Sequence, residues 1–269
     1  MYKEKKLKKY KVTQYTIKST KLCKNKATRM VVLSDFHNNS YGLNQEDVLK
    51  KIIELAPDYV LIAGDMCTGS PGCDNENATW LLRRIAEKYE VYYGLGNHEY
   101  RMMIYPDRYP GMYDAFKKMA DESGIHLLMN EKVEISRGSS TIRIYGLMID
   151  RSFYKKFKIT AMSSDYVGKL LGEPDENLYN ILIAHHPSYF PQYAEWGADL
   201  VVSGHVHGGM ARLPLLGGII APNYRLFPKY DKGMFYEDDA VMILSAGIGT
   251  HTINLRPFNP PEIVVVDLV

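Results

Sequence analysis

Apolar runs that end in polar residues alternate with amphipathic segments over the N-terminal part of the chain. Residues 28–37, 58–65 and 91–99 are rich in Val, Leu, Ile and Tyr and end in polar side chains, a pattern typical of buried strands. Between them, residues 44–58 and 78–90 space their apolar side chains as a helix does. Alternating strands and helices predict a largely parallel sheet covered by helices, with ligands gathered at the carboxyl ends of the strands.

The C-terminal part of the chain is richer in strands. Residues 126–136 and 141–149, on either side of a Gly-Ser-Ser turn, predict a hairpin, and residues 165–172 predict a short helix. Further buried strands are expected at 179–187, 198–209, 240–249 and 260–268. Neither an internal repeat nor a linker interrupts the pattern, so residues 1–269 are expected to form a single domain.

Positive charge is concentrated at the N-terminus. Residues 1–29 contain ten Lys and one Arg against the single acid Glu4, a balance of +10, so the net charge of +2 leaves −8 for the rest of the chain. Such a basic arm can bind anionic lipid or nucleic acid. A solvated tail that leads into an edge strand guarded by lysines, expected within residues 12–19, explains the charge equally well. Binding of nucleic acid is therefore not expected.

Neither a secreted nor a membrane protein is indicated. No apolar segment follows the N-terminal lysines, and no stretch approaches the ~18 apolar residues of a membrane span, so a stable membrane anchor is not expected. Cys23, Cys67 and Cys73 are odd in number and form no CxxC pair, which argues against a disulfide framework. These features favour a cytoplasmic protein.

Side chains with metal-binding atoms lie at five of the expected strand ends. The segments are "SDFH", "GD", "GNHE", "AHHP" and "GHVH", and they contain six of the eight histidines. The candidate ligands are Asp35, His37, Asp65, Asn97, His185 or His186, His205 and His207. Taken one at a time, each of these residues is more often structural than a ligand. Gathered at one edge of the fold, carboxylate, imidazole and amide groups indicate a metal site.

The spacing and the donor types narrow the kind of metal. In an extended segment residues i and i+2 point to the same side, so Asp35 is expected to converge with His37, and His205 with His207. Nitrogen and oxygen ligands without thiolate suit Mn²⁺, which we expect first, and also Fe or Zn²⁺. Seven candidate ligands exceed the needs of one ion. Two divalent metal ions about 3.5–4 Å apart, bridged by a carboxylate, are therefore expected.

Such a pair of ions is suited to phosphoester hydrolysis, because it lowers the pKa of a bridging water and neutralises phosphate oxygens during attack. The sequence therefore predicts cleavage of a phosphomonoester or phosphodiester by a metal-bridging hydroxide. His98 is expected to assist the leaving group, since it follows Asn97 in what reads as a turning loop and can face the substrate.

In this order, the five segments resemble the motifs of the calcineurin-like metallophosphoesterases. The resemblance runs from Asp35 to His207, about two-thirds of the chain. It implies a four-layer α/β/β/α sandwich of two mixed sheets flanked by helices, with a dinuclear centre at its rim. It would give Asp35, His37 and His207 to one ion, Asn97, His185 and His205 to the other, and Asp65 to both. His98 would stand in the place of the family's catalytic acid, and the ending "H-x-P" favours His185 over His186 as the ligand.

Two longer segments indicate which branch of the family the chain resembles. Residues 204–222 and 253–268 are similar to a bacterial group of small phosphohydrolases that includes UDP-diacylglucosamine hydrolase-like proteins. Some members of that group act on lipid precursors or are membrane-anchored, and this chain lacks the apolar N-terminal segment of the anchored members. The resemblance implies a small phosphorylated substrate, which is a metabolite, a nucleotide or a lipid-linked compound.

Two other functions stay open at the level of sequence. A catalytically silent binding or scaffold protein of the same fold would be expected to lack ligands or His98, and this chain lacks neither. A nuclease would need a nucleic-acid surface, for which the basic arm is the candidate.

Overall fold

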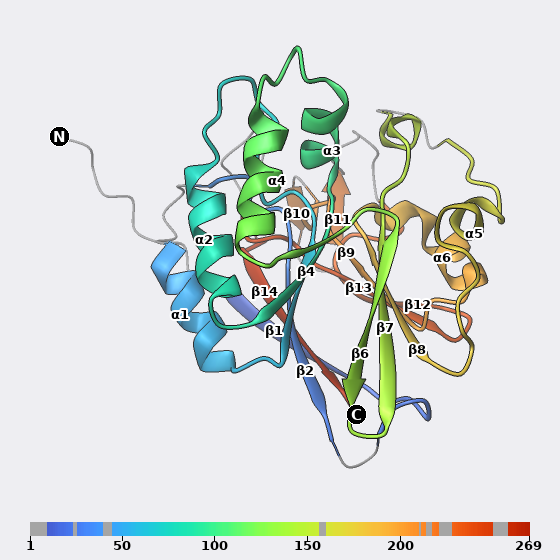
Figure 1. Ribbon diagram of the computed structural model, residues 1–269. Helices are drawn as coiled ribbons and strands as arrows, with labels where there is room; N and C mark the ends of the chain where they lie inside the picture. The colour runs from blue at the N-terminus through green and yellow to red at the C-terminus, as the bar shows by residue number, and fades with distance from the viewer. Residues whose placement is uncertain are drawn as a thin grey trace.

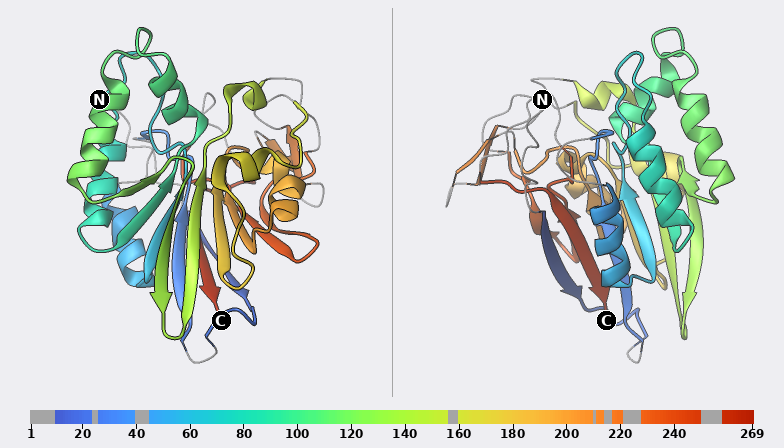
Figure 2. Two further views of the ribbon diagram at one scale, coloured as in Figure 1. Left: turned by 45° about the vertical axis from the view of Figure 1, so that its right-hand side comes forward. Right: turned by 90° about the vertical axis from the view of Figure 1, so that its left-hand side faces the viewer.

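Two six-stranded sheets stack face to face in the computed structural model, and helices cover their outer faces (Figure 1). The structure describes residues 10–23, 26–39, 45–155, 160–209, 211–213, 217–220, 228–249 and 258–269. The turned views of Figure 2 show the layers in order, with blue and green helices outside one sheet and yellow and orange helices outside the other. This confirms the four-layer α/β/β/α sandwich of two mixed sheets.

The first sheet has the strand order β1-β14-β2-β3-β4-β5. These strands are β1 (Lys11–Ile17), β14 (Glu262–Leu268), β2 (Thr28–Leu33), β3 (Tyr59–Ala63), β4 (Glu90–Gly94) and β5 (His126–Leu128). All neighbours are parallel except β14 and β2. Helices α1 (Gln45–Leu55), α2 (Glu76–Ala86) and α4 (Met112–Glu122) cover its outer face, and α3 (Asn97–Ile104) follows β4. The expected edge strand near the N-terminus is confirmed as β1.

The second sheet has the strand order β12-β13-β9-β8-β7-β6. These strands are β12 (Gly233–Glu237), β13 (Ala240–Leu244), β9 (Leu200–Ser203), β8 (Tyr179–Ala184), β7 (Ser140–Leu147) and β6 (Glu131–Arg137). The four inner strands are parallel, and the two outer ones run antiparallel to their neighbours. Helices α5 (Tyr166–Leu171) and α6 (Phe190–Trp196) and the short helices η1 (Arg151–Tyr154) and η2 (Pro187–Tyr189) lie on this side. Strands β10 (Ala211–Leu213) and β11 (Gly217–Ile220) form a separate antiparallel pair.

Each central strand is buried on both faces, which explains its continuous apolar run. In β2, Val31 packs toward the helices and Val32 toward the second sheet, and both are fully buried. In β8, Ile183 belongs to the core between the sheets and Leu182 to the core beneath α5 and α6. Burial of each such side chain contributes about 1.5–3 kcal/mol. The period-two alternation thus builds three apolar layers and holds the two sheets together.

The structure confirms some expectations from the sequence and corrects others. The largely parallel sheet expected for the N-terminal strands is confirmed, since only β14 and β2 are antiparallel neighbours in the first sheet. The hairpin is confirmed as β6 and β7, and the short helix near residue 165 as α5. Helix α2 ends at Ala86 rather than at residue 90, because Glu90 already begins β4. Helices α3, α4 and α6 were not predicted, since they are short and their apolar positions are mixed with Tyr and Gly.

The carboxyl ends of β2, β3 and β4 from one sheet and of β8 and β9 from the other open toward the same end of the molecule, opposite the C-terminus (Figure 1). All the candidate ligands follow these five strands. Within the described residues, no helix is long and apolar enough to cross a membrane. Residues 1–9 of the basic arm lie outside the described residues.

Candidate metal centre

Three overlapping groups of His and Asp side chains converge where the five strands end. Each group consists of three residues whose ligand atoms all lie within 4.8 Å of one another. The groups are Asp35, His37 and His207; His37, Asp65 and His98; and Asp65, His185 and His205. Because His37 and Asp65 each belong to two groups, the three groups form one continuous cluster contributed by both sheets.

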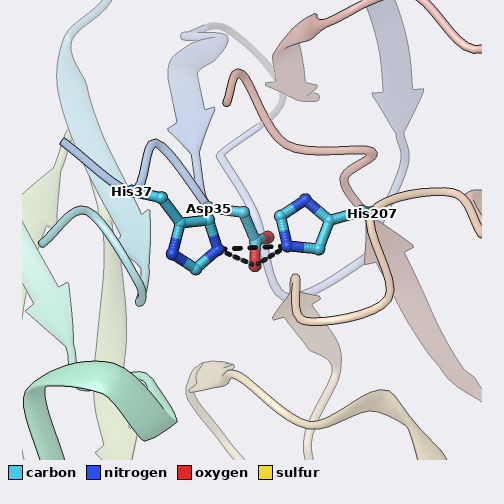
Figure 3. A group of neighbouring side chains, drawn as sticks. All are labelled: Asp35, His37 and His207. Atoms are coloured by element: carbon cyan, nitrogen blue, oxygen red, sulfur yellow. Dashed lines mark hydrogen bonds and ion pairs between the residues drawn. The ribbon is translucent and has the colours of Figure 1, made fainter. Parts of the chain in front are cut away.

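The first group joins the loop after β2 to the loop after β9 (Figure 3). Nε2 of His37 lies 3.1 Å from Nε2 of His207. Oδ1 of Asp35 lies 3.9 Å from the first of these nitrogens and 3.5 Å from the second. Two imidazole nitrogens and one carboxylate oxygen therefore face a common point, as Figure 3 shows, and this is a donor set that a divalent cation accepts.

The third group places His185 against Asp65. Nε2 of His185 lies 3.2 Å from Oδ2 of Asp65, and the same carboxylate oxygen lies 4.0 Å from Nε2 of His37. Asp65 thus stands between the two histidine groups. Its position is the one that a bridging carboxylate requires.

Hydrogen bonding fixes the tautomer of His185. Its Nδ1 lies 2.6 Å from the carbonyl oxygen of Ala63, which can only accept, so Nδ1 carries the proton. Nε2 is buried and faces Oδ2 of Asp65, so its lone pair becomes available to a metal ion when the ring is neutral. A backbone carbonyl that orients an imidazole in this way is a common second partner of metal-binding histidines.

His186 is placed differently, although it adjoins His185 in the sequence. Its Nδ1 accepts a hydrogen bond of 3.3 Å from Ser188 N, and the centroid of its ring lies 5.2 Å from that of Tyr154. Burial and the neighbouring His185 lower the pKa of His186 to about 3, so the ring is neutral. His186 belongs to none of the three groups formed by the described residues. The structure therefore brings His185, and not His186, to the carboxylates.

Asn97 and His98 begin helix α3, so the expectation of a turning loop is wrong at this position. Oδ1 of Asn97 is buried and accepts no hydrogen bond from a described residue, a costly state for an amide oxygen without a ligand. The backbone N–H of His98 donates to Oδ1 of Asp65 at 2.7 Å. Nδ1 of His98 accepts from Gly69 N at 3.0 Å, so neutral His98 carries its proton on Nε2. His98 and His185 thus have opposite tautomers.

Two carboxylates lie deep in the cluster, because Asp35 is 0% and Asp65 is 2% exposed. Burial, with a contribution from Asp65, raises the pKa of Asp35 to about 6. Burial also opposes ionisation of Asp65, but His185, His98 and His37 outweigh it and hold its pKa below the usual range. No Lys or Arg forms an ion pair with either carboxylate in the described part of the chain. Buried acids surrounded by imidazoles favour a bound cation.

Left-handed backbone conformations aim the side chains at the cluster. Asp35, His37, Asp65, His205 and His207 have φ angles of 53°, 52°, 55°, 73° and 52°. Asp35 and His37 converge as expected, but through left-handed rather than extended backbone, because the strands end before these residues. The expected convergence of His205 with His207 is wrong, since these two residues belong to different groups. Such conformations cost about 1–3 kcal/mol each and concentrate at functional sites.

Sequence reasoning missed Glu99, which holds two of the site loops together. Its carboxylate accepts hydrogen bonds from Asp65 N and Cys67 N at 2.9 Å and from the hydroxyl of Tyr93 at 2.8 Å. It also accepts from Gly96 N at 3.1 Å, as the third residue of helix α3 in a capping box. Burial and the charge of Asp65 raise the pKa of Glu99 to about 7. The available sequence cue was a Glu three residues after Gly96, the N-cap residue of α3.

Comparisons with known proteins agree with this geometry. The profile of the calcineurin-like phosphoesterases matches residues 28–209, which include all the candidate ligands. An uncharacterised metallophosphoesterase of Aquifex aeolicus is 29% identical over 266 residues, which cover 96% of this chain and 91% of the relative. The UDP-2,3-diacylglucosamine pyrophosphatase LpxG of Chlamydia trachomatis is 23% identical over 282 residues, which cover 88% of this chain and 82% of the relative. The solved structure of phosphopantetheinyl hydrolase from Mycobacterium tuberculosis shares the fold with a TM-score of 0.50 at 13% identity, over 83% of this chain and 89% of that chain.

Proposed function

The chain belongs to the calcineurin-like phosphoesterase family, whose members are hydrolases of phosphoric ester bonds, and on that premise we propose that its cluster holds two divalent metal ions. One ion would be held by Asp35, His37 and His207, the other by Asn97, His185 and His205, with Asp65 shared between them. The observation that carries the proposal is the pair of histidine groups that meet at Asp65. A single ion would leave half of these buried donors without a partner.

The individual donors fit such a centre. Oδ1 of Asn97 is buried and makes no hydrogen bond with a described residue, and Nε2 of His185 is buried beside the carboxylate of Asp65. Nitrogen and oxygen donors without thiolate suit Mn²⁺ first, and also Fe or Zn²⁺. When bound, two such ions supply activation of water for attack on phosphorus and neutralise the phosphate oxygens.

His98 would assist the leaving group. Gly69 N fixes its proton on Nε2, so the ring can donate a hydrogen bond to an oxygen that gains negative charge as its bond to phosphorus breaks. The backbone N–H of His98, bonded to Asp65, fixes the ring relative to the metal ligands. Nδ1 of His185 faces a carbonyl oxygen, whereas Nδ1 of His98 faces the backbone N–H of Gly69. This difference favours His98 as the residue that assists the leaving group rather than as a metal ligand.

The substrate would be a small phosphomonoester or phosphodiester. The name of LpxG describes action on the pyrophosphate of a lipid-linked nucleotide sugar, and a metabolite, nucleotide or lipid-linked phosphate is the corresponding class for this chain. We propose that the whole chain acts as one domain, because β14 from its C-terminal end lies between β1 and β2. The described cysteines form no disulfide, which suits a reaction in the cytoplasm.

Metal analysis of the purified protein, together with hydrolysis of matched chromogenic mono- and diesters, tests this function. We expect two ions per chain after reconstitution with Mn²⁺ and turnover that disappears on chelation and returns on addition of Mn²⁺. Asp65→Asn, which keeps the size of the side chain, should lose metal and activity together, whereas the surface substitution Asp121→Asn on α4 should change neither. A reconstituted protein that binds metal but hydrolyses neither ester would contradict the proposed reaction.

A further inference from the structure

Arg101 has a guanidinium group beside His98 that the proposed reaction has not yet used. It lies on α3, one helical turn after His98, and its Nη2 is 2.8 Å from both ring nitrogens of that histidine. Its Nε is buried and donates no hydrogen bond to any described residue. A permanent positive charge therefore lies at the edge of the metal cluster.

No carboxylate neutralises this charge. Arg101 forms no ion pair within the described residues, although most of the partly buried arginines do, for example Arg137 with Asp58 and Arg143 with Glu134. The nearest site acids are already engaged, since Asp65 accepts from His98 N and Glu99 accepts from four donors. Arg101 is half-buried, and partial removal of a charge from water without a partner is unfavourable, so the position favours an anion that is not part of the protein.

His98 does not satisfy the guanidinium either. A neutral imidazole has one lone pair, and the lone pair on Nδ1 already accepts from Gly69 N at 3.0 Å. Nε2 then carries a proton, and two N–H groups cannot bond to each other. The contact of 2.8 Å thus places donors of Arg101 and the Nε2–H of His98 side by side. The ring therefore offers no acceptor to the guanidinium of Arg101, whose donors suit an oxyanion.

The guanidinium is also held in a defined place. A Cβ atom at Gly69 would lie 2.6 Å from Nε of Arg101 and 2.8 Å from the carbonyl oxygen of His98. A glycine at this position therefore lets the loop after β3 pack directly against the side chain. Because the loop and helix α3 together limit its rotamers, little conformational entropy remains to be lost when a ligand binds.

We propose that Arg101 binds the non-bridging oxygens of the substrate's phosphoryl group, next to the leaving-group oxygen at His98. This role rests on the proposed phosphoesterase function and assigns a substrate-binding residue outside the metal ligands. A planar guanidinium with several donors suits the oxygens of a phosphoryl group and offers bidentate hydrogen bonds that an ammonium cannot.

Binding of inorganic phosphate, measured by calorimetry on the Mn²⁺-loaded protein, tests the role directly. Arg101→Gln should weaken phosphate binding by roughly 10- to 100-fold, the effect of losing charge-assisted hydrogen bonds. The affinity of Arg101→Lys should lie between those of the wild type and Arg101→Gln. The matched control is Arg108→Gln, which removes the same charge from an exposed side chain packed on Tyr109 and should bind phosphate like the wild type. Ester hydrolysis by each protein gives kcat and KM separately, and unfolding temperatures verify that each variant is folded.

The outcomes separate this role from its alternatives. If Arg101→Gln lowers kcat but binds phosphate as tightly as Arg108→Gln does, Arg101 only positions His98 and the anion-binding role is overturned. If the wild type binds phosphate in an Arg101-dependent manner yet hydrolyses no ester, the anion site is supported and the proposed reaction fails. An active wild type that binds no phosphate at millimolar concentration would also overturn the role. Should Arg101→Gln not fold, the Lys variant provides the same comparison.

Discussion

Substitution of Gly204 by Ala tests whether the packing of Asp35 controls the metal centre. Gly204 lies between β9 and His205, and its φ is not in the left-handed region, so alanine is conformationally allowed there. The added Cβ would lie 2.3 Å from Oδ2 of Asp35 and 2.8 Å from Cβ of Ser34. Ordinary contact begins at 3.4 Å, so the carboxylate must move by 3.4 − 2.3 = 1.1 Å or the β9 loop must retreat by the same distance.

Such a movement has two expected costs. Asp35 accepts bonds of 3.0 Å from His205 N to both oxygens, and their loss together with overpacking should destabilise the protein by about 1–3 kcal/mol. In a chain of this size the unfolding temperature changes by roughly 2–4 °C per kcal/mol. A displacement of a ligand by about 1 Å should also lower kcat/KM by about 10²-fold, through misplacement of the reacting groups.

The assay combines metal content, ester hydrolysis and thermal unfolding. The matched control is Gly168→Ala in helix α5, where the added Cβ would lie 2.9 Å from the flexible end of Glu173 and in ordinary contact with Trp196 at 3.9 Å. That substitution should leave metal and activity unchanged and stabilise the helix by roughly 0.5–1 kcal/mol. If Gly204→Ala keeps the metal, the turnover and the unfolding temperature of the wild type, contact with Asp35 does not control the site and the reasoning is refuted.

Three further outcomes follow from individual side chains. His98→Gln should retain both ions but lower kcat by about 10²–10⁴, and unchanged kcat would remove His98 from the reaction. Burial opposes protonation of His185, but Asp65 outweighs it and raises the pKa of His185 to about 9, so metal binding at pH 8 should release close to one proton per chain. Calorimetry in buffers of different ionisation enthalpy measures this release, and its absence would exclude His185 as a ligand. The hydrogen bond of 2.7 Å from Arg29 lowers the pKa of Asp267 in the folded protein. The ionised carboxylate therefore stabilises the fold above the pKa of an unfolded Asp, about 3.9, and this stabilisation is lost as the pH falls through the lower pKa of the folded state. Asp267→Asn should therefore cost about 1 kcal/mol at pH 7 and progressively less toward pH 3 in urea unfolding, and an equal cost at both values would contradict the assignment.

The local pattern of side chains was sufficient to identify the central strands and the residues that end them. Continuous apolar runs such as residues 28–33 and 179–184 are buried on both faces, and this requirement appears directly in the sequence. The chemistry of the candidate site was equally accessible, because carboxylate and imidazole groups at strand ends mark a metal-binding edge. The structure brings Asp35, Asp65, His185, His205 and His207 together as the pattern predicted.

The assignment of strands to two sheets was not visible in the periodicity. β14 is an apolar run like β2, yet it runs antiparallel to β2 and pairs with β1 on its other side. Pairing partners depend on contacts between segments far apart in the chain, which a single segment does not encode. The resemblance to a family, rather than the periodicity, supplied the four-layer arrangement.

The roles of individual site residues were decided by tertiary contacts. His185 and His98 are the same residue type at similar strand ends, but Ala63 O fixes a proton on Nδ1 of one and Gly69 N fixes a proton on Nε2 of the other. Arg101 follows the "GNHE" segment without any mark of function in the sequence, and its importance arises from the absence of an acidic partner among the described residues around it. Residue type and spacing were thus determined by the sequence itself. Backbone groups from distant segments decided which lone pair, proton or charge faces the site. A hydrogen bond forms only where its partner lies in space, and that position depends on the tertiary structure.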